Sequence, residues 1–179
     1  MSYGPQWAEA GSAPFKYFKG YTTEGGMTAP LIITGPQIER YNSLESQFLT
    51  LMDIAPTLYD LLEISYPSKY NSHEIEALKG ASLLPLFKDD AVKIHDVNYV
   101  FALEHRGYAM LRKGDWKLVN IQSPLDLKNF ELYNIKSDPG ESVNVRQLHP
   151  NEFETLLLEW DVFSKQVGVV TPTPKSGAH

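Results

Sequence analysis

Lys19 stands five residues ahead of the motif Glu24-Gly25-Gly26, and the apolar run APLIIT (29–34) follows that motif. A lysine ammonium can hold an anion as a compact point charge, and it can stabilise negative charge that develops on oxygen atoms during a reaction. Composition alone favours a solvated surface charge, because lysine is almost never buried without a partner. Two hypotheses for Lys19 follow, a surface charge and one wall of an anion site.

Other residues with catalytic chemistry have simpler structural interpretations. The segment SAPFK (12–16) suggests a serine nucleophile, but no histidine stands in a recognisable arrangement with it, so a loop with a proline-fixed turn is favoured. Glu104 and His105 are neighbours on a predicted strand and therefore point to opposite faces, which indicates a strand end rather than an acid–base pair. The segment DPGE (138–141) is most simply a turn.

Composition excludes several partners. The histidines at 73, 95, 105, 149 and 179 have no metal-ligand spacing and cysteine is absent, so a complete metal site within this chain is not expected. A net charge of -6, with scattered Lys and Arg, gives no basic field for a nucleic-acid backbone. No apolar run reaches the roughly 18 to 20 residues of a membrane helix. The sequence thus predicts neither a nucleic-acid nor a membrane partner.

The elements that must position Lys19 begin in residues 1–65. The run 29–34 is predicted to be a strand covered on both faces, as in parallel α/β sheets. Asp53 and Pro56 predict a helix start, with Asp53 as cap and Pro56 in the first turn. The helix would present one apolar face, formed by Leu58, Leu61 and Leu62. One strand and one helix do not make a sheet domain, so we expect a C-terminal remnant of an α/β domain that self-associates or stays mobile.

The remaining sequence predicts a polar link at 66–96, with a short helical turn at SLLPLF (82–87), and a self-sufficient α+β domain at 97–167. Strands are predicted at 97–104, 108–113, 116–121 and 130–135. Tight connections join the first three, which indicates an antiparallel meander. A helix that starts at His149-Pro150 has one apolar face and is expected to cover this four-stranded sheet. The tail 168–179 is predicted to be disordered.

The strand 116–121 illustrates the expected alternation. Its two faces are predicted to carry Trp116, Leu118 and Asn120 on one side and Lys117, Val119 and Ile121 on the other. Trp116 and Trp160 could be stacking platforms for a sugar or a base, but at their spacings a core position is favoured.

Four motifs, at 4–36, 51–64, 111–119 and 130–145, follow one another as they do in the carboxy-terminal third of sulfatases. From about Gly4 to about Lys165 the chain resembles this family, the arylsulfatase branch of the alkaline-phosphatase superfamily. The resemblance implies an alkaline-phosphatase-like α/β fragment followed by a small α+β domain, in which an antiparallel four-stranded sheet is packed by a C-terminal helix.

The resemblance also implies a function. Lys19 would reach the sulfate group of the substrate. A formylglycine nucleophile, made from Cys or Ser in a Cys/Ser-x-Pro-x-Arg signature, and a calcium ion held by Asp and Asn would lie outside this chain, so the isolated chain is expected to be inactive. SAPFK resembles that signature by accident and ends in Lys16. Ser12 and Lys16 depart from the Asn and Arg that the family often has, and the link at 66–80 is idiosyncratic.

Three hypotheses follow for the protein of which this chain is a part. The first is a sulfuric ester hydrolase. The second is a sister phosphonate or phosphate ester hydrolase of the same superfamily, since the downstream motifs are partly shared. The third is a non-catalytic interaction module with Lys19 idle on its surface. The sequence determines neither the natural substrate nor the localisation, for which a periplasmic or secreted parent is one alternative.

Overall fold

The computed structural model describes residues 4–89 and 91–170. The chain forms two compact units. Met1–Pro30 and Asn98–His179 form one, here the sheet unit, and Leu31–Val97 forms the other, here the inserted unit. The predicted domain limits at 65 and 96 concern the parent protein and stay a prediction. Most of the predicted disordered tail lies outside the described residues.

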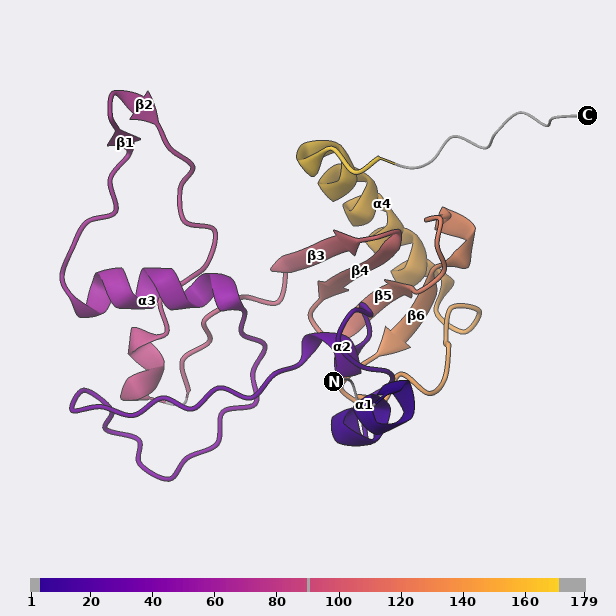
Figure 1. Ribbon diagram of the computed structural model, residues 1–179, viewed down its shortest axis with the longest axis horizontal. Coiled ribbons are helices and arrows are strands. Elements are labelled where there is room, and N and C mark those ends of the chain that lie inside the picture. Colours follow the sequence, from indigo (N-terminus) through magenta and orange to yellow (C-terminus); the bar gives the residue numbers. More distant parts are fainter. Residues whose placement is uncertain (1–3, 90, 171–179) are drawn as a thin grey trace, which may run out of the picture. The chain divides into compact units, whose positions relative to one another are not determined.

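The sheet unit is built on a four-stranded antiparallel sheet with the order β3-β4-β5-β6 (Figure 1). The strands are β3 Val100–His105, β4 Tyr108–Lys113, β5 Trp116–Asn120 and β6 Glu131–Asn134. Arg106 and Gly107 join β3 to β4 with φ of 57° and 86°, the left-handed pair that suits a two-residue hairpin. The predicted meander is therefore confirmed.

One face of this sheet is covered by α4 (Pro150–Val167), as predicted. The helix places Phe153, Leu156 and Trp160 against Leu111 and Leu118 of the central strands, and all five side chains are buried. Trp160 is thus a core residue, as favoured from its spacing, and Trp116 packs against the edge of the same core. Burial of this apolar surface is the main stabilising contribution to the sheet unit.

The opposite face of the sheet meets the amino-terminal segment of the chain. This segment contains α1 (Gly4–Ser12) and the single-turn helix α2 (Glu24–Met27). In the strand β5, Leu118 points into the core under α4, while Lys117 points the other way and pairs with Glu24 of α2. The sheet is thus apolar on one side and receives a polar contact from α2 on the other.

The inserted unit has a smaller core. Its elements are the 3-10 turn η1 (Leu51–Asp53), the helix α3 (Ile54–Leu61), the short hairpin β1 (Lys69–Tyr70) and β2 (His73–Glu74), and the 3-10 turn η2 (Leu84–Phe87). The predicted helix and the predicted turn at 82–87 are confirmed. The buried apolar residues are Leu83, Leu86 and Phe87.

The predicted strand at 29–34 is not formed. The segment has no regular structure, and Ile32 is 91% exposed. A strand needs a neighbour for its backbone N–H and C=O groups, and no described strand pairs with this segment. The sequence pattern identified a segment suited to burial, but the described residues supply no sheet that could bury it.

Asp53 is the buried polar centre of the inserted unit. Its carboxylate accepts hydrogen bonds from the backbone N–H of Thr50 (2.6 Å) and of Ala81 (2.9 Å) and lies 3.0 Å from Nε2 of His95. Burial raises the pKa of Asp53, but the bonds from His95 and the two N–H groups outweigh burial and leave it below its usual value. Asp53 is the N-cap residue of α3, as predicted, yet its carboxylate joins three separate segments rather than the helix.

None of the helices in the described ranges is long and apolar enough to cross a membrane.

Candidate functional site

Lys19 is exposed on the segment Lys16–Thr23, here the Lys19 loop, which connects α1 to α2. Within the part of the chain that the structure describes, its ammonium has no hydrogen bond or ion pair. An exposed ammonium on a short loop is available to an external anion. Its usefulness depends on how firmly that loop is held.

The two glycines after Glu24 let the Lys19 loop lie directly on α2. A Cβ atom at Gly25 would come within 2.2 Å of the carbonyl oxygen of Tyr17, and one at Gly26 within 2.2 Å of that of Tyr21. Neither glycine has a positive φ. Both residues are helical, and they serve close backbone approach rather than a turn with positive φ.

Hydrogen bonds inside the segment hold this close packing. The carbonyl oxygen of Lys16 accepts from the hydroxyl of Thr23 (2.6 Å) and from the N–H of Gly25 (3.2 Å). The N–H of Tyr21 donates to the carbonyl oxygen of Phe18 (3.1 Å), which closes a tight turn around Lys19. The loop and α2 therefore form one hydrogen-bonded piece.

Thr22 attaches this piece to the sheet. Its hydroxyl lies 3.1 Å from the carbonyl oxygen of Ala109 and 3.3 Å from that of Asn120, two residues that face each other across β4 and β5. Thr22 is 1% exposed. A buried hydroxyl without such acceptors would be unfavourable, so this contact fixes where the loop meets the sheet.

Aromatic rings make a second attachment. The ring of Tyr21 stacks on that of Tyr17 at 4.6 Å and on that of Tyr108, the first residue of β4, at 5.3 Å between centroids. The ammonium of Lys16 lies 5.8 Å from the centroid of the Tyr17 ring. The side chains on both sides of Lys19 are thus ordered against the sheet unit.

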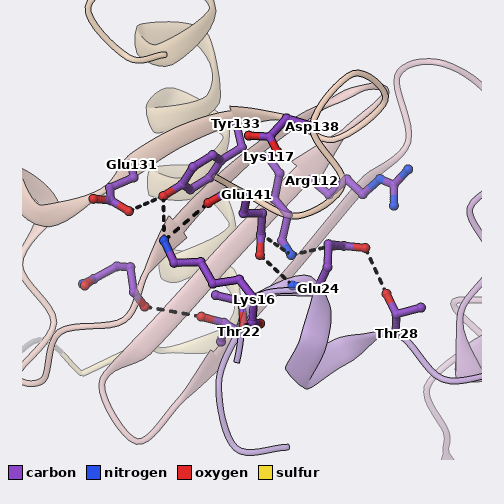
Figure 2. Close-up of polar contacts among 12 residues, drawn as sticks. Lys16, Thr22, Glu24, Thr28, Arg112, Lys117, Glu131, Tyr133, Asp138 and Glu141 are labelled. Carbon is purple, nitrogen blue, oxygen red and sulfur yellow. Dashed lines mark hydrogen bonds and ion pairs between the residues drawn. The ribbon is translucent and has the colours of Figure 1, made fainter. Parts of the chain in front are cut away.

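A buried ion triad, formed by Lys117, Glu24 and Glu141, makes the third attachment (Figure 2). Nζ of Lys117 donates a hydrogen bond to Oε1 of Glu24 at 2.6 Å. It also forms an ion pair with Oε1 of Glu141 at 2.9 Å. The backbone N–H of Glu24 donates to Oε2 of Glu141 at 2.8 Å. The side chains of Lys117 and Glu141 are completely buried.

The electrostatics of the two carboxyl groups differ. Burial raises the pKa of Glu24, but the charge and hydrogen bond of Lys117 outweigh burial and leave that pKa below its usual value. Burial also raises the pKa of Glu141, and there the attraction of Lys117 does not overcome it. Glu24 is therefore the carboxylate that Lys117 holds most firmly in its ionised form.

Lys16 bridges the loop to the last strand. Its ammonium donates to the hydroxyl of Tyr133 on β6 (3.2 Å) and to the carbonyl oxygen of Glu141 (3.4 Å), and the Tyr133 hydroxyl donates to the carboxylate of Glu131 (Figure 2). Burial and the nearby Glu131 charge raise the pKa of Tyr133. Lys16 is thus engaged in fixing the loop, whereas Lys19 points to solvent.

Sequence reasoning singled out Lys19 and missed Lys117, Glu24 and Glu141. One signal was present, because the predicted alternation set Lys117 on the same face of a central strand as the apolar residues Val119 and Ile121. Glu141 follows the confirmed turn at Asp138 and has a φ of 52°, an unusual value for a non-glycine residue. That its carboxylate meets Lys117 could be seen only in three dimensions.

The weaker candidates have structural roles. The hydroxyl of Ser12 donates to the carbonyl oxygen of Ala8 at the end of α1, and the carboxylate of Glu104 accepts from the N–H of Gly107 in the β3–β4 hairpin. Within the described ranges, no group of three or more His, Cys, Asp and Glu residues is arranged to hold a metal ion. Around the Lys19 loop, the structure brings together the charged residues Lys16, Glu24, Lys117 and Glu141.

Comparison with known proteins gives the class. Residues 15–158 match the family described as N-sulphoglucosamine sulphohydrolase, C-terminal, and this range covers the Lys19 loop, the sheet and the first half of α4. The chain belongs to this family of sulfatase carboxy-terminal domains. The resemblance of the sequence motifs to sulfatases is thereby confirmed.

Individual relatives agree with that class. An uncharacterized sulfatase of Schizosaccharomyces pombe is 32% identical over 170 residues, which are 94% of this chain and 30% of that protein. An arylsulfatase of Klebsiella aerogenes is 32% identical over 84 residues, which are 46% of this chain and 18% of that protein. The chain thus spans less than a third of the length of these relatives.

Solved structures support the fold. The crystal structure of Ps i-CgsB matches with a TM-score of 0.62 at 22% identity and covers 85% of this chain and 32% of that one. The structure of Ps i-CgsB in complex with k-i-k-neocarrahexaose matches with a TM-score of 0.64 at 21% identity, with the same coverage. The arrangement of this chain is therefore one that occurs within larger proteins.

Proposed function

We propose that this chain is the carboxy-terminal part of a sulfuric ester hydrolase and that Lys19 binds the sulfate group of the substrate. Membership of the sulfatase family supports the reaction class. The observation that carries the role of Lys19 is its exposed ammonium on a loop attached to the sheet through Thr22, the tyrosine stack and the buried ion triad.

The chemistry of sulfate esters suits this arrangement. The ester group is anionic, and cleavage of its S–O bond places further negative charge on the sulfuryl oxygens and on the leaving oxygen. A cation that is already held in place stabilises that charge without having to reorganise during the reaction. Lys19 would act as a binding and electrostatic group, and no bond to it forms or breaks.

The residues that the structure describes do not fit the formylglycine and calcium that the family implies. Ser12 is bonded within α1 and Lys16 is bonded to Tyr133, so SAPFK does not present a free serine and cation together. No acidic cluster suited to a metal lies in the described part of the chain. We therefore place the formylglycine nucleophile and the calcium ion in the remainder of the parent, and expect the isolated chain to be inactive. Calcium-dependent turnover of an aryl sulfate by the purified chain would contradict this.

The test of Lys19 uses the parent protein, obtained by sequencing the DNA upstream of the Met1 codon and expressing the full reading frame. Replacing Lys19 with Ala should lower kcat for an aryl sulfate by about 10²- to 10³-fold, the loss typical of a single charge-stabilising group. The control is Lys69→Ala, which removes another exposed lysine. Unchanged kcat in Lys19→Ala would favour the non-catalytic module, and faster turnover of phosphate or phosphonate esters would favour the sister hydrolase.

We further propose that residues 1–65 include the last part of an α/β domain completed elsewhere in the parent. Leu31, Ile32 and Ile33 are exposed in a segment whose pattern suits a buried strand. The isolated chain should therefore self-associate through this segment, and sedimentation velocity should show a concentration-dependent increase in mass that Ile32→Ser weakens. A monomer at all concentrations, together with resistance of residues 29–66 to proteases, would overturn this assignment.

A further inference from the structure

The Lys19 loop is followed by Glu24, whose side chain is held by Lys117, a residue 93 positions further along the chain. We propose that Lys117 is the positioning residue of Lys19: its buried ammonium fixes Glu24, and Glu24 fixes the helix α2 on which the Lys19 loop lies. The catalytic consequence of this proposal rests on the proposed function of Lys19. The structural consequence can be tested independently of it.

The first argument is that a buried ion triad is not needed to fill this part of the sheet unit. Lys117 is completely buried and lies across from Arg112 on β4 and Tyr133 on β6. Replacing a buried ion pair or triad by apolar residues of similar size is often neutral or stabilising. Apolar residues at all three positions could fill this volume, whereas a methionine at 117 alone would leave two buried carboxylates without their cation. What the ammonium adds is therefore a directed contact to Glu24 and Glu141.

The second argument is that the contact reaches the loop through the backbone. The side chain of Glu24 is held by Lys117, and the N–H of Glu24 is held by Glu141. Gly25 and Gly26 follow at once and touch the carbonyl oxygens of Tyr17 and Tyr21 with no room for a Cβ atom. A displacement of Glu24 therefore displaces the backbone on both sides of Lys19.

The third argument is the conformation of Glu141. Its φ of 52° is unfavourable for a residue with a side chain, and a glycine would adopt it without strain. The chain instead has a glutamate there, with its carboxylate completely buried against Lys117 and the N–H of Glu24. Both carboxylates of the triad are thus arranged around the start of α2.

The structural test is backbone hydrogen exchange, measured by NMR on the whole chain. In Lys117→Met, the N–H groups of Glu24, Gly25 and Gly26 should lose roughly 100-fold or more of their protection, because removing one partner leaves buried carboxylates without their cation. The N–H groups of β4 and β5 should lose much less. The matched control is Lys113→Met, which removes the 2.6 Å ion pair between Lys113 of the neighbouring strand β4 and Glu159 of α4.

Two outcomes would overturn the proposal. Equal loss of protection in α2 and in the sheet would assign Lys117 a general structural role, and unchanged protection in α2 would mean that Thr22 and the tyrosine stack suffice.

If Lys117→Met does not fold, Glu141→Gln keeps the volume and the cation while it weakens the hold on Glu24. In that variant the N–H groups of α2 should lose protection selectively, but by a smaller factor than in Lys117→Met. Unchanged protection of these N–H groups in Glu141→Gln would also contradict the proposal.

The functional test is a double-mutant cycle in the full-length parent, with an aryl sulfate as substrate. Lys117→Met should lower kcat more than it changes KM, and Lys117→Met combined with Lys19→Ala should be no slower than Lys19→Ala alone. Additive losses would show that Lys117 acts independently of Lys19. If Lys19→Ala alone has no effect, the proposed function fails, whereas the exchange experiment still decides whether Lys117 positions the loop.

Discussion

The two units of this chain differ in how far their apolar residues are buried. In the sheet unit, Leu111, Leu118 and Trp160 are at most 2% exposed between the sheet and α4. In the inserted unit, Ile32, Leu44 and Leu51 are each at least 90% exposed, and Leu58 on α3 is 51% exposed. Ordinary surfaces carry scattered apolar residues, but such a group in so small a unit exceeds that pattern.

The difference shows which part of the chain is complete in itself. A meander with its covering helix satisfies its backbone through neighbouring strands and buries its apolar face locally. The inserted unit carries a helix, a two-residue hairpin and a segment that suits a strand but lacks a partner. Its sequence is therefore suited to an environment that the described residues do not provide.

The largest expected effect concerns the two cores. Trp160→Ala should reduce the free energy of unfolding of the sheet unit by about 3 to 5 kcal/mol, since it leaves a cavity between α4 and the sheet. Leu58→Ala should change the free energy of unfolding of the inserted unit by less than about 0.5 kcal/mol, because Leu58 is half exposed. Urea denaturation followed by circular dichroism measures both. Comparable losses would mean that α3 is packed in solution and would remove the contrast between the units.

The next effect concerns close backbone approach. Gly25→Ala should destabilise the sheet unit by about 1 to 3 kcal/mol, because its Cβ would meet the carbonyl oxygens of Lys16 and Tyr17. Gly35→Ala in the inserted unit has only the Gln37 side chain nearby, at 3.9 Å, and should be nearly neutral. Thermal unfolding of the two variants provides the comparison. A neutral Gly25→Ala would show that the Lys19 loop can move away from α2 at little cost.

An effect of similar size, confined to neutral pH, concerns the buried charge of the inserted unit. The folded-state pKa of Asp53 is lowered, so its ionised carboxylate stabilises the fold above the ordinary value of 3.8, and that contribution is lost as the pH falls through the folded pKa. Asp53→Asn should therefore cost about 1 to 3 kcal/mol at pH 6, with the difference from wild type shrinking below pH ~3.8. Urea titrations between pH 2.5 and 6 measure this. A constant difference would mean that ionisation of Asp53 contributes nothing.

The sequence predicted those elements whose stabilising contacts are local. The hairpins at Arg106-Gly107 and Gly114-Asp115 and the helix that starts at Pro150 follow from turn residues and periodicity, and each is present. The segment 29–34 was assigned wrongly because a strand depends on a partner that need not be nearby in the sequence. The pattern described what the segment suits, not what surrounds it.

The site shows the same limit. The position of Lys19 ahead of the Glu24-Gly25-Gly26 motif raised the question of its role, and the resemblance to sulfatases implied that it binds sulfate. Its exposed ammonium fits both a surface charge and one wall of an anion site. Lys117 and Glu141 were interpreted as part of a strand and of a turn, which they also are. Their second role depends on a pairing between segments about 93 and 117 residues apart, and single-sequence patterns do not encode such pairings.

The long reach of the ion triad has a consequence for biosynthesis. Glu24 leaves the ribosome 93 residues before Lys117, which at about 5 to 20 residues per second is a delay of roughly 5 to 20 s. For most of that interval the nascent segment around Lys19 lacks the strands that receive Thr22, and for all of it the segment lacks the cation that receives Glu24. A translation product arrested before Tyr108 would contain every residue of the Lys19 loop and none of the sheet contacts that give it its native conformation.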